Sequence, residues 1–154
     1  LVDARALCSA TYHSPGKPPR LVLGPEPDEL TTELLRAATA KRALAIKPVL
    51  LDQRVVAGLG NIYAAEALWR ARIDPTRAAR TLSDAQLRLL VRAIKAAIAD
   101  GFARQGRYRH GSRERPFKVY DREGCHCTRC RTPIARITQS GRSTYYCPRC
   151  QRTA

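Results

Sequence analysis

Four cysteines near the carboxyl end of the chain constrain its fold more than any other feature. They form two C-x-x-C pairs, Cys127/Cys130 and Cys147/Cys150, with sixteen residues between the pairs. This spacing is typical of a zinc ribbon, in which each pair forms a tight knuckle that presents two thiolates to one tetrahedral ion. Disulfide bonds or redox chemistry are the alternatives. The spacing favours one structural zinc ion.

The residues around the cysteine pairs agree with a zinc ribbon. Ile134–Thr138 and Ser143–Tyr146 have the composition of two strands joined by a turn, and they predict a β-hairpin. A segment this short cannot bury a hydrophobic core, so metal binding would supply much of its folding free energy. Two cysteines, Cys8 and Cys125, are expected to be free thiols. Cys125 and His126 directly precede the first knuckle and are rival candidates for a ligand.

The charge of the chain points to a polyanionic partner. It has 28 Lys and Arg against 13 Asp and Glu, a net charge of +15. Residues 101–154 hold 13 of these basic residues against 3 acidic ones, so ten of the fifteen net charges lie there. Nucleic acid is the usual partner for such a density of charge, although a generic basic protein from a GC-rich genome is an alternative.

A membrane partner is disfavoured by the same composition. The basic segment is rich in Gly, Pro and polar residues and is not amphipathic. No apolar run approaches the roughly 18 residues that span a bilayer, and no signal-peptide pattern opens the chain. We therefore expect a soluble protein of the cytoplasm.

Hydrophobic periodicity and composition together divide the chain into four parts. Residues 1–24 look like a strand remnant and a linker, and residues 25–104 have helical patterning. Residues 105–120 form a basic loop, and residues 121–154 contain the cysteine pairs. The predicted fold class is a mainly α-helical domain followed by a small β-hairpin zinc ribbon.

Capping signals mark the first and last helices of the 25–104 part. Asp28 or Thr31 can cap the first helix, and a capping box of Ser83 and Gln86 opens the last one, which we expect to end at Gly101. The first helix is predicted to bury four apolar residues on one face, namely Leu30, Leu34, Leu35 and Ala38.

The sequence GLGN, at residues 58–61, precedes a helix and is a candidate phosphate site. Glycines let the backbone approach a ligand closely, and the first helical turn offers unpaired N–H groups at a positive dipole end. Asn61 is expected to cap this helix. Arg42 and Lys47 lie upstream and could complete a clamp on a phosphate backbone. A simple turn with an Asn cap explains GLGN equally well.

Three stretches together resemble the carboxyl-terminal part of the formamidopyrimidine-DNA glycosylase/endonuclease VIII family. They are AIKPVLLDQRVVAGLGNIYAAEALWRARIDP, FKVYDREG and CTRC…SGRSTYYCPRC, and the similarity runs from Leu23 to Gln151. The resemblance implies a helix-two-turn-helix domain followed by a zinc finger. The family's amino-terminal β-sandwich carries a catalytic proline and glutamate. Because this chain starts at Leu1 and Val2, we expect a fragment that largely lacks that domain.

The resemblance implies a function in base-excision repair. Members of the family flip oxidised bases of the formamidopyrimidine and 8-oxoguanine type out of double-stranded DNA, excise them and cut the abasic site. The fragment would be the DNA-binding carboxyl-terminal half of such a bifunctional glycosylase and lyase, a bacterial monomer normally joined to its catalytic domain. A stand-alone DNA-binding module without catalysis is the main alternative. A zinc-ribbon accessory protein of ribosomes or transcription is another.

The resemblance also implies roles for individual residues. Asn61 and the amides around Gly60 match the family's phosphate-binding turn, while Arg42 and Lys47 match basic residues that contact DNA. Arg142, in the turn of the hairpin, matches an arginine that grips phosphates beside the lesion and assists δ-elimination. The zinc ion would then hold the hairpin so that Arg142 projects into the DNA.

Four further residues carry expectations. By resemblance, Arg5 would enter the gap left by the flipped base, and Leu7 replaces an aromatic wedge of well-known members. Glu66 is either a buried acid that orders the GLGN turn or a solvent-facing residue, and Trp69 is expected in the core. The family's loop that closes over some flipped bases would include Arg107, Arg109 and Arg113.

Overall fold

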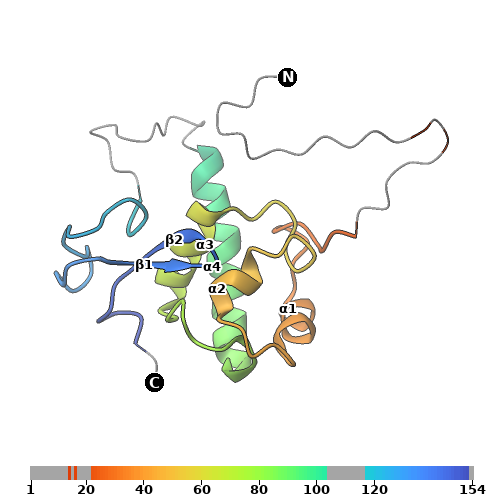
Figure 1. Ribbon diagram of the computed structural model, residues 1–154, viewed down its shortest axis with the longest axis horizontal. Coiled ribbons are helices and arrows are strands. Elements are labelled where there is room, and N and C mark those ends of the chain that lie inside the picture. The colour runs from red at the N-terminus through yellow and green to blue at the C-terminus, as the bar shows by residue number, and fades with distance from the viewer. Residues whose placement is uncertain (1–13, 15, 17–21, 104–116, 153–154) are drawn as a thin grey trace.

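The computed structural model describes residues 14, 16, 22–103 and 117–152. In these residues, helices are followed by one β-hairpin. The strands pair antiparallel in the register that sets Gln139 opposite Arg142. The predicted fold class is confirmed (Figure 1). The elements are α1 (Thr32–Thr39), α2 (Ile46–Leu50), α3 (Asn61–Ala71), the 3-10 helix η1 (Ala79–Thr81), α4 (Asp84–Ala103), β1 (Ala135–Gln139) and β2 (Arg142–Tyr146).

The helix α4 begins as its capping signal predicts but ends later. The Ser83 amide donates to Gln86 Oε1 at 3.0 Å, and the Gln86 amide donates to Ser83 Oγ at 3.3 Å. The prediction that the helix ends at Gly101 is wrong. A Cβ at Gly101 would collide with the ring of Tyr63 on α3, so this glycine permits close packing of α3 on α4. In the described part of the chain, no helix is long and apolar enough to cross a membrane.

The helix α1 is shorter than the hydrophobic pattern suggested. Thr31 is its N-cap, with Oγ1 accepting from the Leu34 amide at 3.2 Å. Leu30 and Leu35 are buried, whereas Leu34 is 46% exposed, so its predicted place on the buried face is wrong. Leu34 and Leu35 are neighbours along the helix and point about 100° apart, and the structure turns Leu35 into the core while Leu34 faces outward.

The helix α3 is buried on two faces and belongs to two hydrophobic cores. Its Ala64, Ala67 and Leu68 pack into the core formed by the helices. Its Ala65 and Trp69 pack into a second core with the ribbon. A helix that is apolar on most sides is expected between two layers, and in Figure 1 α3 lies between the hairpin and the other helices. The other residues of the second core are Val119, just before the ribbon, and Cys127, Ile134 and Cys147 of the ribbon.

Glu66 fastens the segment that precedes the ribbon to α3. Its side chain is buried, with 3% of its surface exposed. Its carboxylate accepts the backbone N–H groups of Lys118 at 3.0 Å, Val119 at 2.9 Å and Tyr120 at 3.1 Å. Glu66 is therefore a buried hydrogen-bonding acid, but it orders residues 118–120 and not the GLGN turn.

Several expectations concern residues outside the described part of the chain. They include most of the strand remnant and linker expected in residues 1–24, and residues 105–116 of the basic loop expected in 105–120. The residues concerned are Arg5, Leu7, Cys8, Arg107, Arg109 and Arg113.

Replacing Glu66 by alanine should destabilise the protein strongly. The change leaves three N–H groups without their acceptor, and a buried donor such as that of Val119 costs on the order of 1–3 kcal/mol when unpaired. We expect the free energy of unfolding, measured by urea titration, to fall by at least about 2 kcal/mol. Glu123→Ala, which removes one exposed ion pair with Arg136, is the matched control and should cost less than about 1 kcal/mol. Equal effects of the two changes would contradict the anchoring role of Glu66.

Candidate nucleic-acid interface and its metal centre

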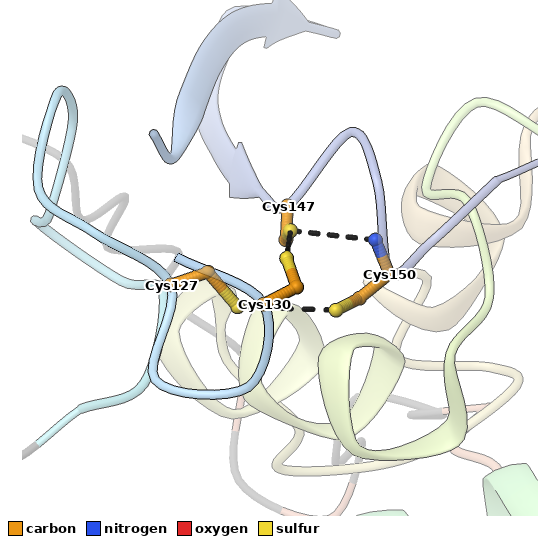
Figure 2. Close-up of side chains that lie close together, drawn as sticks. All are labelled: Cys127, Cys130, Cys147 and Cys150. Carbon is orange, nitrogen blue, oxygen red and sulfur yellow. Dashed lines mark hydrogen bonds between the residues drawn. The ribbon is translucent and has the colours of Figure 1, made fainter. Parts of the chain in front are cut away.

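The four knuckle cysteines come together at one point of the structure. Their sulfur atoms all lie within 4.8 Å of one another (Figure 2). The Sγ atoms of Cys127 and Cys150 are 3.9 Å apart, and those of Cys130 and Cys147 are 3.4 Å apart. Sulfurs around one tetrahedral zinc with bonds of about 2.3 Å are separated by about 3.8 Å. The cluster therefore fits one zinc ion, which would hold the two ends of the hairpin together.

Backbone N–H groups of both knuckles point at these sulfurs. The Arg129 amide donates to Cys127 Sγ, and the Cys150 amide donates to Cys147 Sγ, each at 3.4 Å. Such bonds stabilise thiolates, which are the form that binds the metal. The knuckle backbone is therefore arranged for charged sulfur ligands.

The thiols of the cluster have different pKa values. Hydrogen bonding by Thr132 lowers the pKa of Cys130 to about 6. Burial, together with hydrogen bonds among the neighbouring thiols, raises the pKa of Cys150 to about 12. Four thiolates so close together repel one another, and a divalent ion compensates that repulsion.

The rival ligand candidates lie outside the sulfur cluster. The ring Nδ1 of His126 is 2.8 Å from the Arg131 carbonyl oxygen, and the Cys125 amide donates to the Arg122 carbonyl at 3.0 Å. In the described part of the chain, the metal-ligand cluster contains only the four knuckle cysteines.

The ribbon is bound to the end of α3 through its first knuckle. The guanidinium of Arg129 stacks on the ring of Trp69, 3.6 Å from the ring centroid, and donates to the Trp69 carbonyl at 2.6 Å. Gln151 donates to the Ile73 carbonyl at 2.9 Å, just beyond α3. A cation at the carboxyl end of a helix satisfies free carbonyl groups and complements the helix dipole. These contacts join the ribbon and the helices into one unit.

A second junction, here called the polar centre, joins α2, α3 and β2. It consists of Lys47, Asn61, Ser143 and Thr144. The Lys47 ammonium donates to Asn61 Oδ1 at 2.6 Å, to Thr144 Oγ1 at 2.8 Å and to the Ser143 carbonyl at 3.3 Å. Asn61 Nδ2 donates to the same carbonyl at 3.0 Å. Residues more than 80 positions apart in the chain therefore share one hydrogen-bond network.

Lys47 is a buried cation at the middle of the polar centre. Its side chain is fully buried, and its three N–H donors have three oxygen acceptors. Among the described residues, no carboxylate bonds to this ammonium. Burial, and then the positive charge of Arg142, lowers the pKa of Lys47 to about 8. The structure thus places Lys47 beneath the surface, and its contact with DNA stays a prediction.

The GLGN turn is shaped by Gln53. The Gly58 amide donates to Gln53 Oε1 at 2.7 Å, and Gln53 Nε2 donates to the Leu59 carbonyl at 3.3 Å. Gly58 has a φ of 74°, which favours glycine. The N-cap of α3 is Gly60, which supplies no side-chain hydrogen bond, so the predicted Asn61 cap is wrong. Asn61 is the first helical residue, and its side chain is held in the polar centre.

The uncapped start of α3 leaves donors for an external acceptor. The first amides of a helix have no partner within it, and the N-cap Gly60 has no side chain to cap them. Gly58 and Gly60 are exposed, so the backbone is accessible at this point. The first turn of α3 therefore presents N–H groups and a positive dipole end beside the polar centre.

The two arginines proposed for DNA contact have different surroundings. Arg142 is exposed at the start of β2, next to the hairpin turn, and its charge acts on Lys47. Arg42 instead donates to Asp52 Oδ2 at 2.9 Å, and its side chain is 37% exposed. The structure brings Gly60, Asn61, Lys47 and Arg142 to the polar centre and its rim, while Arg42 is held by Asp52.

Three residues of this site were not predicted from the sequence, namely Gln53, Ser143 and Thr144. Arg142 and Thr144 are two positions apart on a strand, so they share a face of β2. That alternation was a usable signal for Thr144. No sequence pattern predicted the roles of the Ser143 carbonyl and the Gln53 side-chain amide, because these roles depend on how the folded backbone places them.

Two known protein families match parts of the chain. The helical part, residues 23–110, matches the formamidopyrimidine-DNA glycosylase H2TH domain. Residues 126–153 match the zinc finger found in FPG and IleRS. The fold and the metal centre therefore define a helix-two-turn-helix domain joined to a zinc finger. The chain belongs to the formamidopyrimidine-DNA glycosylase family, as the sequence motifs predicted, and its finger holds one structural zinc ion.

Curated relatives share close to half of their residues with the chain over the aligned regions. The formamidopyrimidine-DNA glycosylase of Paracoccus denitrificans is 42% identical over 165 residues, covering 97% of this chain and 59% of the relative. That of Erythrobacter litoralis is 49% identical over 142 residues, covering 84% and 52%. The chain spans about half the length of the curated relatives it matches.

Solved structures of the family have the same fold. A complex between Lactococcus lactis Fpg and DNA containing an abasic site matches with a TM-score of 0.76 and 34% identity, over 85% of this chain and 52% of that one. MutM in complex with DNA containing carbocyclic 8-oxo-G matches with a TM-score of 0.77 and 37% identity, over 85% and 51%.

Replacing Cys147 by serine should abolish zinc binding and unfold the hairpin. A hydroxyl is a poor replacement for a thiolate, and the ribbon is too small to fold without metal. Zinc content per chain, measured by mass spectrometry of the purified protein, should fall well below that of the unsubstituted chain. Cys125→Ser is the control and should retain zinc. An unchanged zinc content in the Cys147 variant would refute the ligand assignment.

Replacing Lys47 by methionine should change how stability depends on pH. The pKa of Lys47 falls from its usual 10.5 to about 8 on folding, so between these pH values the unfolded chain binds more protons and stability rises with pH. Across this window the unsubstituted chain should gain on the order of 3 kcal/mol relative to Lys47→Met in urea unfolding. Lys41→Met, at an exposed lysine, should show no such gain. A constant difference between Lys47→Met and the unsubstituted chain would contradict this burial.

Proposed function

We propose that this chain is the DNA-binding carboxyl-terminal half of a formamidopyrimidine-DNA glycosylase and abasic-site lyase that acts on oxidised bases in double-stranded DNA. The observation that carries the proposal is the polar centre, where the buried Lys47 ammonium lies beneath Asn61 and near the exposed Arg142. Two positive groups close together, without a carboxylate among the described residues at the ammonium, favour an anion at the adjacent surface.

A DNA phosphate suits this surface better than a small anion. The donors come from two separate elements, the first turn of α3 and the hairpin turn at the start of β2. Such a divided set of donors fits an extended backbone, which offers oxygens in succession, and it positions the duplex without reading bases. The excess of basic residues in the chain, net charge +15, favours the same polyanion.

Each residue of the site has a proposed part. The amides after Gly60 and the side chain of Asn61 would bind one phosphate, and Arg142 would bind phosphate beside the lesion and assist δ-elimination. Lys47 would contribute charge from beneath. Arg42 would contact the backbone from its position beside Asp52, and Arg5 would fill the gap left by the flipped base. These assignments rest on the family's motifs and on the geometry at the polar centre.

Catalysis by this half alone is not part of the proposal. The chain spans about half the length of the relatives it matches, and the activity belongs in this proposal to the longer protein. We infer that it acts as a monomer, joined to a catalytic domain and located with the chromosome in the cytoplasm. A stand-alone module that binds DNA without catalysis is the alternative, and both share the same DNA-binding surface.

The direct test is binding of the purified zinc-loaded chain to a duplex with an abasic-site analogue, measured by fluorescence anisotropy at several salt concentrations. Replacing Asn61 or Arg142 by alanine should weaken binding by about tenfold each, as expected for a charge-assisted contact. Arg142→Ala should also reduce the slope of log affinity against log salt by about one.

Arg88→Ala is the matched control, since Arg88 is exposed on α4 beside Thr32 of α1. It should retain the affinity and the salt slope of the unsubstituted chain. Binding that does not depend on salt, or equal losses in the Arg88 and Arg142 variants, would refute the proposed surface. Borohydride added to a natural abasic site tests catalysis in the same samples, because trapping would reveal an amine in this chain that attacks the sugar.

A further inference from the structure

The ribbon contributes one side chain to the polar centre, the hydroxyl of Thr144. Thr144 is fully buried on β2, and its Oγ1 accepts from the Lys47 ammonium at 2.8 Å. The other ribbon acceptor is a backbone carbonyl, that of Ser143, at the longer distance of 3.3 Å. Thr144 therefore supplies the shorter of the two bonds that connect the ribbon to Lys47.

The Lys47 ammonium in turn orients the amide group of Asn61. An ammonium has donors only, so the atom of Asn61 that faces it must be the oxygen, Oδ1, at 2.6 Å. This orientation turns Nδ2 toward the Ser143 carbonyl, to which it donates one hydrogen at 3.0 Å. An amide nitrogen carries two hydrogens, and among the described residues none accepts the second. That second N–H group is available to a ligand.

The chain of contacts thus runs from the ribbon to the start of α3. We propose that Thr144 is a positioning residue for DNA binding: its hydroxyl holds the Lys47 ammonium, and the ammonium fixes the Asn61 amide with its free N–H toward a phosphate. This inference rests on the proposed function and adds to it the part of Thr144. Thr144 itself does not touch the DNA.

The arrangement has a consequence for the dependence of DNA binding on pH. The charged group that acts on Lys47 from β2 is Arg142, while Asn61 from α3 and Ser143 and Thr144 from β2 are neutral. Three oxygen acceptors stabilise the charged ammonium, so they oppose the lowering of the Lys47 pKa by burial and by Arg142. Without the Thr144 hydroxyl, Lys47 loses its proton at lower pH, and a neutral amine no longer requires Oδ1 of Asn61 to face it.

Thr144→Val tests this inference, because valine keeps the shape of threonine and lacks the hydroxyl. Affinity for the abasic-site duplex should fall about three- to tenfold at neutral pH, the effect of one hydrogen bond. In a series from about pH 6.5 to about pH 9.5, the loss of affinity should begin at lower pH than in the unsubstituted chain. Thr144→Ser restores the hydroxyl and should restore both the affinity and the pH profile.

Thr138→Val is the matched control, since Thr138 is an exposed threonine of β1 opposite Ser143. It should bind DNA with an unchanged pH profile. Zinc content and melting temperature are measured on every variant. If Thr144→Val does not fold, Thr144→Ala replaces it. In that case the pH titration of Lys47 is also followed by NMR through its Cε resonance, and the unsubstituted chain and Thr144→Ser must show the same titration midpoint.

The possible results separate the inference from the proposed function. If the unsubstituted chain binds DNA and Thr144→Val has the same affinity and pH profile, the positioning role is wrong and the proposed function stands. Equal losses in Thr144→Val and Thr144→Ser would also overturn the inference, since the hydroxyl would not be the cause. If the unsubstituted chain does not bind the duplex, the proposed function fails and the inference fails with it.

Discussion

The packing of the helices against the ribbon depends on the hydrogen bonds of one buried cation, the ammonium of Lys47. A cation removed from water is stable in a folded protein only where fixed polar groups replace its hydration. Here Asn61, Ser143 and Thr144 provide three oxygens from α3 and β2, and Lys47 itself comes from α2. None of these elements satisfies the charge alone. The need to satisfy it therefore holds α2, α3 and β2 together, in addition to the contacts that seat the ribbon on α3.

Zinc and the polar centre are coupled through β2. The ribbon has too few apolar residues to fold unaided, so the strand that carries Ser143 and Thr144 forms only when the metal joins its knuckles. The stacking of Arg129 on Trp69 and the anchoring of residues 118–120 by Glu66 then seat the ribbon on α3. In the proposed function, a structural ion thereby controls a phosphate site on a helix that it does not touch.

Local signals in the sequence predicted the local features of this fold. The cysteine spacing predicted the metal centre, and Ser83 and Gln86 predicted the start of α4, because both patterns specify their own contacts. Features that depend on a distant partner were not predictable in this way. Gly101 looked like a helix end, but it faces Tyr63 of α3, and Asn61 looked like a cap, but Lys47 and Ser143 bind its side chain. For Glu66, the residues that bind its carboxylate lie more than 50 positions away.

The central claim is that the helical domain and the ribbon present one continuous surface to DNA. Amide NMR spectra of the zinc-loaded chain, recorded while an abasic-site duplex is added, test it most directly. The account predicts that the amides of Asn61–Tyr63 and those of the hairpin turn around Arg142 shift together, with the same midpoint and one duplex per chain. Shifts confined to the ribbon, or separate midpoints for the two regions, would contradict it.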